Sequence, residues 1–222
     1  MAPDMAKKRK LLLASLLAVL FAWASGAVWA GYKARRWDIR ARDAYPSSLT
    51  SEGVTIAAEP LFTDALAAEV FDKNDMVTRG IMPLAIVIFN DNDFPIEVDG
   101  MTAELIHESE HTRTMVPNEV VYRLFKNDRS WISRQIPRVS KSELNEDALD
   151  DFDQKFLMNP VIAPHDKGGG FLYLHVAGGK DLAAYLSKSV VYIPNIYRRD
   201  DGSRMIFFEI ELNASIGAQT GS

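Results

Sequence analysis

Residues 80–90 have the sequence GIMPLAIVIFN, and this stretch decides the fold. Every position from Leu84 to Phe89 is apolar, so the alternation of a half-buried strand is missing there. A strand with this pattern is buried on both faces, which places it in the middle of a domain. We therefore expect Leu84 to Phe89 to be the central strand.

Shorter strand candidates lie on both sides of this segment, and turn residues separate them. They are Val54 to Ala57, Pro95 to Val98, Met101 to Leu105, Thr112 to Val116, Phe171 to Val176, Val190 to Ile193, Ile196 to Arg198 and Arg204 to Leu212. Asn90 to Asp93 and Asp166 to Gly170 have the composition of turns. Asp201-Gly202 favours a tight hairpin between the last two strands, because glycine accepts a positive φ.

Helical signals interrupt this series of strands. Asn118 can cap a helix over Glu119 to Phe125, and Ser140 with Glu143 matches the capping box ahead of a longer helix. Thr63-Asp64 can also cap a brief helix that continues to Phe71. One face of the longer helix carries apolar residues at a spacing of four: Leu144, Ala148, Phe152 and Phe156.

Short strands with two helical insertions are typical of a mainly β chain. The pattern predicts an antiparallel immunoglobulin-like β-sandwich over residues 53–212. Residues 213–222 are small and polar, so we expect a disordered tail there.

Four segments resemble those of uncharacterised bacterial envelope proteins that carry one immunoglobulin-like β-sandwich behind an N-terminal signal or anchor. The segments are GVTIAAEP (53–60), GIMPLAIVIFNDNDFPIEVDGMTAELI (80–106), GGGFLYLHV (168–176) and MIFFEIEL (205–212). The resemblance implies the sandwich fold and a location in the cell envelope, and it transfers no active-site residues. Some of those proteins are lipoproteins, whereas this chain has no cysteine to carry acyl chains.

The N-terminal region predicts a membrane anchor. Leu11 to Ala30, LLLASLLAVLFAWASGAVWA, contains no charged residue, and a helix of this length spans about 30 Å, enough to cross a bilayer's hydrocarbon core. Residues 1–10 end in four basic residues, Lys7 to Lys10, which favours a cytoplasmic N-terminus. We therefore expect an uncleaved single-pass anchor in the inner (cytoplasmic) membrane, with the C-terminal domain in the periplasm.

Two alternatives stay open for this segment. Small residues at Ala22-Trp23-Ala24 and Val28-Trp29-Ala30 fit a signal peptidase site, so secretion after cleavage is one alternative. The opposite orientation is the other, because basic residues also follow the run, within residues 31–52. We expect residues 31–52 to continue the helix and then form a linker.

A stripe of small residues inside the anchor permits close approach of two helices, and hence a homodimer. These residues recur every four positions: Ala14, Ala18, Ala22, Gly26 and Ala30.

Composition excludes several function classes. The net charge of −5 and the pI near 5.4 argue against general nucleic-acid binding, which needs a positive surface. The absence of cysteine excludes disulfides, cysteine-ligated zinc and thiol catalysis.

Residues 107–111, HESEH, match the zinc-binding pattern H-E-x-x-H. This match makes a membrane-tethered zinc hydrolase an alternative, with His107 and His111 as ligands and Glu108 as the base. The surrounding alternation, however, places the motif at the end of a strand and in the following turn, where a spacing of four does not align side chains. We therefore predict no catalytic, cofactor-binding or metal-binding residues.

Asp91, Asn92 and Asp93, with Asp72 and Asp75 upstream, suggest a second alternative, a calcium-dependent adhesion module. Asn and Asp are also ordinary turn residues, and a solvated turn between two strands is the simpler interpretation.

A segment rich in basic and aromatic residues is the candidate surface for a partner. It contains Arg123, Lys126, Arg129, Trp131 and Arg134. Arginine and aromatic residues are enriched at interfaces, and a basic surface near a membrane also attracts anionic lipid. The simpler interpretation is a solvated crossover whose charges are compensated by the acidic residues from Glu143 onward, because charge runs usually mark solvent-exposed faces. The favoured hypothesis is a non-catalytic, membrane-anchored scaffold that binds another envelope component.

Overall fold

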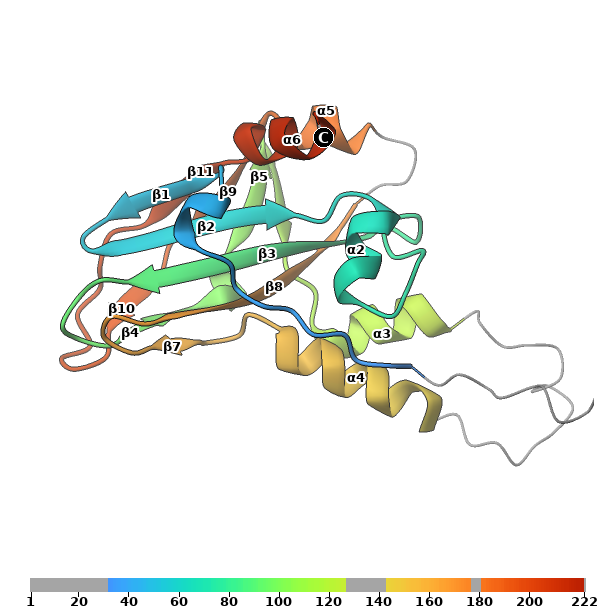
Figure 1. Ribbon diagram of the computed structural model, residues 1–222, viewed down its shortest axis with the longest axis horizontal. Helices are drawn as coiled ribbons and strands as arrows, with labels where there is room; N and C mark the ends of the chain where they lie inside the picture. The colour runs from blue at the N-terminus through green and yellow to red at the C-terminus, as the bar shows by residue number, and fades with distance from the viewer. Residues whose placement is uncertain (1–31, 127–142, 177–180, 222) are drawn as a thin grey trace, which may run out of the picture. The chain divides into compact units, whose positions relative to one another are not determined.

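β3 (Ile81–Asn90) is the central strand of the structure, and all ten of its residues are buried. In the computed structural model, which describes residues 32–126, 143–176 and 181–221, β3 lies between β2 (Val54–Pro60) and β8 (Lys167–His175) (Figure 1). With β1 (Ser48–Ser51) these strands form a first antiparallel sheet, in the order β1-β2-β3-β8. The prediction of a central strand at Leu84 to Phe89 is confirmed.

Two smaller antiparallel sheets complete the β structure. The second sheet has the order β10-β4-β7, formed by Ile196–Arg198, Ile96–Val98 and Val161–Ile162. The third sheet has the order β11-β9-β5-β6, formed by Phe208–Glu211, Ser189–Ile193, Glu104–His107 and Glu110–Arg113. The chain is therefore mainly antiparallel β, as predicted.

The helices are short. They are η1 (Arg42–Ala44), α2 (Asp64–Val70), η2 (Gly100–Thr102), α3 (Pro117–Phe125), α4 (Glu143–Lys155), α5 (Leu182–Leu186) and α6 (Asn213–Thr220). Pro117 occupies the first turn of α3 and Val116 is its N-cap, so the predicted cap at Asn118 is wrong. Proline is favoured at this position because its fixed φ suits a helix start.

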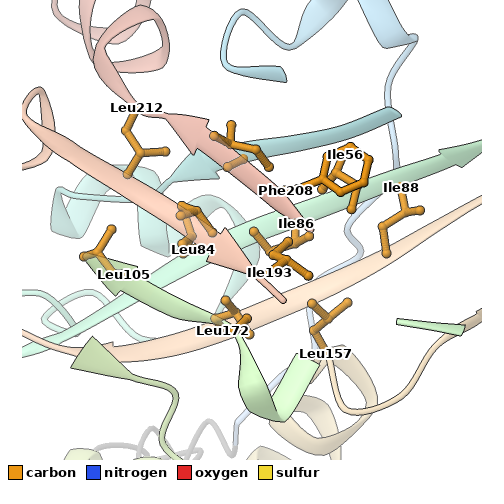
Figure 2. Close-up of a cluster of buried hydrophobic side chains, with 14 of the residues drawn as sticks. Ile56, Leu84, Ile86, Ile88, Leu105, Leu157, Leu172, Ile193, Phe208 and Leu212 are labelled. Atoms are coloured by element: carbon orange, nitrogen blue, oxygen red, sulfur yellow. The ribbon is translucent and has the colours of Figure 1, made fainter. Parts of the chain in front are cut away.

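β3 is apolar throughout because different layers cover its two faces. On one face, Leu84, Ile86 and Ile88 join a core that the first sheet shares with strands of the second and third sheets. Figure 2 shows these side chains together with Leu105, Ile193 and Phe208. On the other face, residues of α2, α3 and α4 form a second core with Ala85 and with aromatic residues of β8.

Residues 32–45 form a segment that we call the strap, which is non-helical over residues 32–41 and then includes η1, and it belongs to the folded unit Tyr32–Ser222. The expected helix and linker over residues 31–52 is therefore wrong for the part that the structure describes. Tyr45 is buried with Val87 and Phe89, and the half-buried Trp37 packs against Phe171 at a ring distance of 4.7 Å. These aromatic contacts favour an extended path over a helix, so the domain begins before residue 53.

The glycines at 168–170 lie inside β8, although the sequence predicts a turn there. They pair with Ile86, Val87 and Ile88 of β3. A Cβ atom on Gly169 would lie 2.2 Å from the Ile86 carbonyl oxygen, and one on Gly170 would lie 2.8 Å from the Lys155 carbonyl oxygen. These glycines therefore allow neighbouring backbone segments to approach β8 closely, and they do not reverse the direction of the chain.

The expected disordered tail at 213–222 is wrong for its described part, where α6 forms instead. Ile216 joins the first core, and Ser215 is buried. The Ser215 backbone N–H donates to the Ser47 hydroxyl over 3.0 Å, and the Ser215 hydroxyl donates to the Ala58 carbonyl over 3.0 Å. These contacts satisfy the buried polar groups and hold α6 on β2.

The hairpin predicted between the last two strands forms next to its turn only. Tyr197 and Arg204 form an antiparallel bridge, and the backbone N–H groups of Arg198 and Met205 donate to the carbonyls of Ser203 and Ile196, at 2.9 and 2.8 Å. Gly202 has the positive φ of 71° that the turn requires. Beyond the turn, β11 pairs with β9, while β10 pairs with β4 on its other side.

The predicted anchor, Leu11 to Ala30, and the basic residues before it lie outside the described residues. Within the ranges that the structure describes, no helix combines the length and the apolar character needed to cross a membrane.

Candidate functional site

The H-E-x-x-H sequence folds as a β-hairpin, which confirms the predicted strand and turn. His107 ends β5, Glu108 lies in the turn with a φ of 52°, and His111 lies in β6. Ile106 is the direct cross-strand partner of His111, and directly opposed residues share a face of the sheet. Since successive residues of a strand alternate between faces, His107 lies on the face opposite to His111.

Each histidine also has its own set of contacts. The His107 ring stacks on Tyr185 at 4.0 Å, and its Nδ1 lies 3.1 Å from the Ser189 hydroxyl. His111 Nδ1 lies 2.7 Å from Glu104 Oε2. The zinc hydrolase alternative requires both imidazoles to reach one metal ion. The hairpin instead directs them to opposite faces of the sheet. Within the described ranges, no three His, Asp or Glu side chains gather closely enough to hold a metal.

The acidic residues of the calcium alternative contact separate partners. Arg42 donates to Asp91 over 2.6 Å, and this hydrogen bond lowers the pKa of the Asp91 carboxyl. Asp93 lies 2.8 Å from His165 Nε2. The side-chain amide of Asn92 donates to the Glu52 carbonyl. The side chains of Asp91, Asn92 and Asp93 thus contact different groups and do not converge on one site.

The two upstream acidic residues lie in other contacts. Asp72 accepts hydrogen bonds from the Lys33 backbone and from Arg35, at 2.9 and 3.1 Å. Asp75 accepts from Arg79 at 2.6 Å. The Asp72 carboxylate thus holds the strap, and the Asp75 carboxylate holds the loop that contains Arg79.

The candidate partner surface is described only at its beginning. Arg123 in α3 donates to Glu119 over 2.8 Å, and Lys126 Nζ lies 5.7 Å from the ring centre of Tyr122. The Tyr122 side chain is 63% exposed, so this face of α3 presents an aromatic ring and two cations to solvent. The other predicted members, Arg129, Trp131 and Arg134, lie outside the described residues.

A buried polar triad of Tyr32, Asp151 and Lys155 was not expected from the sequence. The Tyr32 hydroxyl donates to Asp151 Oδ2 over 2.6 Å, and Lys155 Nζ donates to Asp151 Oδ1 over 2.5 Å. The Asp151 and Lys155 side chains are only 5% and 10% exposed. A buried ion pair needs further hydrogen bonds to offset desolvation, and the Tyr32 hydroxyl supplies one of them.

Aromatic rings enclose this triad. Tyr32 lies between Phe125 and Phe152, at ring distances of 6.1 and 6.2 Å, and Lys155 Nζ lies 5.0 Å from the ring centre of Phe71. Burial is the main cause of the raised pKa of Tyr32 and of the lowered pKa of Lys155.

A lysine with a lowered pKa is a feature of some nucleophilic sites. Lys155 Nζ, however, donates to Asp151 and to the Val70 carbonyl, at 2.5 and 3.1 Å. Both contacts favour the ammonium form, so the geometry supports a structural role. The spacing of Asp151 and Lys155 is a signal that sequence reasoning can use, because residues four apart meet on a helix. Nothing in the sequence indicates that Tyr32 joins them.

Further contacts hold the strap along the first sheet. Arg40 donates to Glu59 of β2 over 2.6 Å, and Arg42 donates to Asp91 just after β3. Lys167 Nζ donates to the Ile39 carbonyl over 2.9 Å. The strap thus runs from the triad at the α4 end of the sheet to the turn that follows β3 (Figure 1).

Comparisons with known proteins give little similarity. The chain matches no protein-family model and no curated protein. Among solved structures, the YjhA protein from Bacillus subtilis is similar at 8% sequence identity and a TM-score of 0.33, over 68% of this chain and 78% of that protein.

Proposed function

We propose that this protein is a membrane-anchored, extracytoplasmic module that binds or scaffolds another envelope component without catalysis. The observation that carries the proposal is the position of Tyr32. Only Gly31 separates this residue from the apolar run Leu11 to Ala30, and Tyr32 already lies among the core aromatic residues of the domain. An apolar segment long enough to span a bilayer is thus followed directly by a folded domain.

The fold class that we propose is the immunoglobulin-like β-sandwich. The shared core between the first sheet and the other two supports this assignment, because two antiparallel sheets that bury their facing side chains define the class. Such sandwiches occur in many cell-surface proteins. Fold alone does not specify a partner, so the binding role depends on the surface.

The surface that we assign to binding is the basic and aromatic segment that begins on α3. Arg123, Lys126 and the exposed Tyr122 support this assignment within the described residues. Arginine and tyrosine are enriched at the centres of interfaces.

Fractionation of cells that express the full-length protein tests the anchor. We expect the protein in the membrane fraction after an alkaline carbonate wash, with a C-terminal tag that protease reaches from the periplasmic side. The matched control is a variant without Leu11 to Ala30, which we expect in the soluble fraction. Release of the full-length protein by carbonate, or a tag that protease reaches only from the cytoplasm, would contradict the proposal.

Native mass spectrometry of the gently extracted protein adds two results. Its mass shows whether Met1 to Ala30 stays attached, and a second polypeptide in the complex identifies the partner. A mass that corresponds to the domain alone would support the secreted alternative instead.

A further inference from the structure

We infer that the exposed face of α3, formed by Tyr122, Arg123 and Lys126, lies against the lipid headgroups of the membrane that holds the anchor. The inference rests on the proposed anchor. Anionic lipid is then the partner that contacts the α3 part of the binding surface.

The chain between the proposed anchor and the domain is very short. One residue spans at most about 3.6 Å of extended chain, so Gly31 allows a separation of only about 7 Å between Ala30 and Tyr32. The headgroup layer on each side of a bilayer is of similar thickness, about 5 to 8 Å. The part of the domain that surrounds Tyr32 must therefore lie within or beside this layer.

Two helices pack around Tyr32. The Tyr32 ring contacts Phe125 at the C-terminal end of α3 and Phe152 in the middle of α4. Lys73 Nζ lies 4.9 Å from the ring centre of Phe125. Figure 1 shows the strap entering the domain beside α3 and α4. The loop at Asp72 also lies beside Tyr32, because its backbone N–H donates to the Tyr32 hydroxyl. Among the helices, α3 and α4 are therefore the candidates for contact with lipid.

The two faces of α3 differ in chemistry. Its inward face buries Val120, Val121 and Leu124, which leaves Tyr122, Arg123 and Lys126 on the outward face. Tyrosine is enriched at the membrane interface, and lysine and arginine side chains extend their charges toward headgroups. Glu119 pairs with Arg123, and Lys126 adds a second positive charge to this face. Such a surface is attracted to anionic lipid.

The chemistry of α4 is the opposite of that of α3. Four of its exposed residues are acidic and would be repelled by an anionic surface: Glu146, Asp147, Asp150 and Asp153. Of the two helices beside Tyr32, α3 therefore lies against the lipid.

The experiment uses single cysteines in the full-length protein, because the native chain has none. Asn118→Cys places a fluorescent label on the exposed face of α3, one turn before Tyr122. Ser203→Cys places the matched control label in the exposed turn after β10. This turn lies near the end of the strap that is distant from Tyr32. Arg42 of the strap donates to Asp91, and the Arg198 guanidinium carbon lies 3.8 Å from the ring centre of Phe94, which is close to Asp91 in the sequence.

Each labelled protein is reconstituted into phosphatidylcholine and phosphatidylglycerol vesicles that carry a headgroup-linked quencher. We expect the Asn118→Cys label to lose most of its fluorescence and the Ser203→Cys label to keep most of it. Adding Arg123→Glu and Lys126→Glu to the Asn118→Cys protein should restore the fluorescence. The matched charge reversals Lys188→Glu and Arg204→Glu, which lie elsewhere, should leave the quenching unchanged.

Vesicle flotation separates the two possible failures. If the protein floats with the vesicles but both labels are quenched equally, or neither is quenched, the inference is wrong and the anchor stands. If the protein does not float, the anchor itself is wrong, and the inference falls with it.

Discussion

Tyr32 and Asp151 are joined by a 2.6 Å hydrogen bond although 119 positions separate them in the sequence. The bond connects the first described residue of the domain to a buried carboxylate in α4, which also holds Lys155. The strap is thereby fixed to the helical layer at the point where the chain enters the domain.

Tyr32→Phe should destabilise the domain by about 1.5 to 3 kcal/mol, because it removes a hydrogen bond to a buried charged group. Urea unfolding at neutral pH measures this change. The matched control is Tyr122→Phe at a 63% exposed position, where we expect a change within about 0.5 kcal/mol. Equal effects at the two sites would contradict a stabilising role for the triad.

Stability should also fall steeply in alkali. Burial raises the pKa values of Tyr32 and Tyr173 in the folded state, whereas a phenol in the unfolded chain ionises near pH 10, at about its ordinary pKa. Above that pH the unfolded chain releases protons that the folded state retains. The stabilisation is therefore present below about pH 10 and is lost as the pH rises further.

Tyr32→Phe removes one of these groups, so its alkaline loss of stability should be shallower than that of the wild type. Urea midpoints measured at successive pH values across this range test the expectation. Tyr173→Phe, which removes the other buried phenol, should change the slope in the same direction. Parallel curves for the wild type and both variants would show that neither phenol is linked to folding.

Gly169→Ala should prevent folding or cost several kcal/mol, because the new Cβ would lie 2.2 Å from the Ile86 carbonyl oxygen. Gly217→Ala is the matched control, since the new methyl group meets no atom within 4 Å and the residue lies in α6. Alanine is the better helix former, so this change should stabilise the domain by up to about 1 kcal/mol. Thermal unfolding of both variants measures the contrast. A well-tolerated Gly169→Ala would contradict the close pairing of β3 and β8.

Removal of the strap should weaken the domain strongly. A protein of residues 32–222 should unfold cooperatively, whereas one of residues 46–222, which keeps β1, should be less stable by at least about 3 kcal/mol. The second protein loses the burial of Tyr45 and the partial burial of Tyr32 and Trp37, and full burial of one aromatic side chain contributes about 1.5 to 3 kcal/mol. Equal urea midpoints for the two proteins would show that the strap does not stabilise the domain.

His107→Ala and His111→Ala should act independently. His107 stacks on Tyr185 and contacts Ser189, whereas His111 is 54% exposed, so His107→Ala should be the more destabilising change. The two effects should add to within about 0.5 kcal/mol in the double variant. The same measurements with added zinc test the hydrolase alternative. A zinc-dependent rise in Tm that either substitution abolishes would support it.

Local patterns predicted a large part of the fold. The apolar run at Leu84 to Phe89 indicated a central strand, and Thr63 indicated the start of α2, where its side chain accepts a hydrogen bond from the Leu66 backbone. Both features depend on residues that are close in the sequence. The hairpin at His107 to His111 was predictable for the same reason.

Other elements were predicted wrongly because distant residues decide them. Gly168 to Gly170 have the composition of a turn, but β3 and the end of α4 pack so closely against them that only glycine fits in the strand. Residues 213–220 have little apolar character, yet Ile216 and Ser215 find partners on β2 and near β1. Tyr32 likewise joins a triad whose other members lie in α4.

The sequence by itself determined the central strand, the mainly β character of the chain and the separation of an uncharged apolar run from the domain that follows it. These properties follow from side-chain hydrophobicity and its period along the chain. The tertiary structure alone decided that the domain begins at the strap, that the two histidines of the hairpin lie on opposite faces, and that Asp151 is buried beside Tyr32. Such features depend on which distant surfaces meet, because burial and hydrogen bonding are properties of packed neighbours.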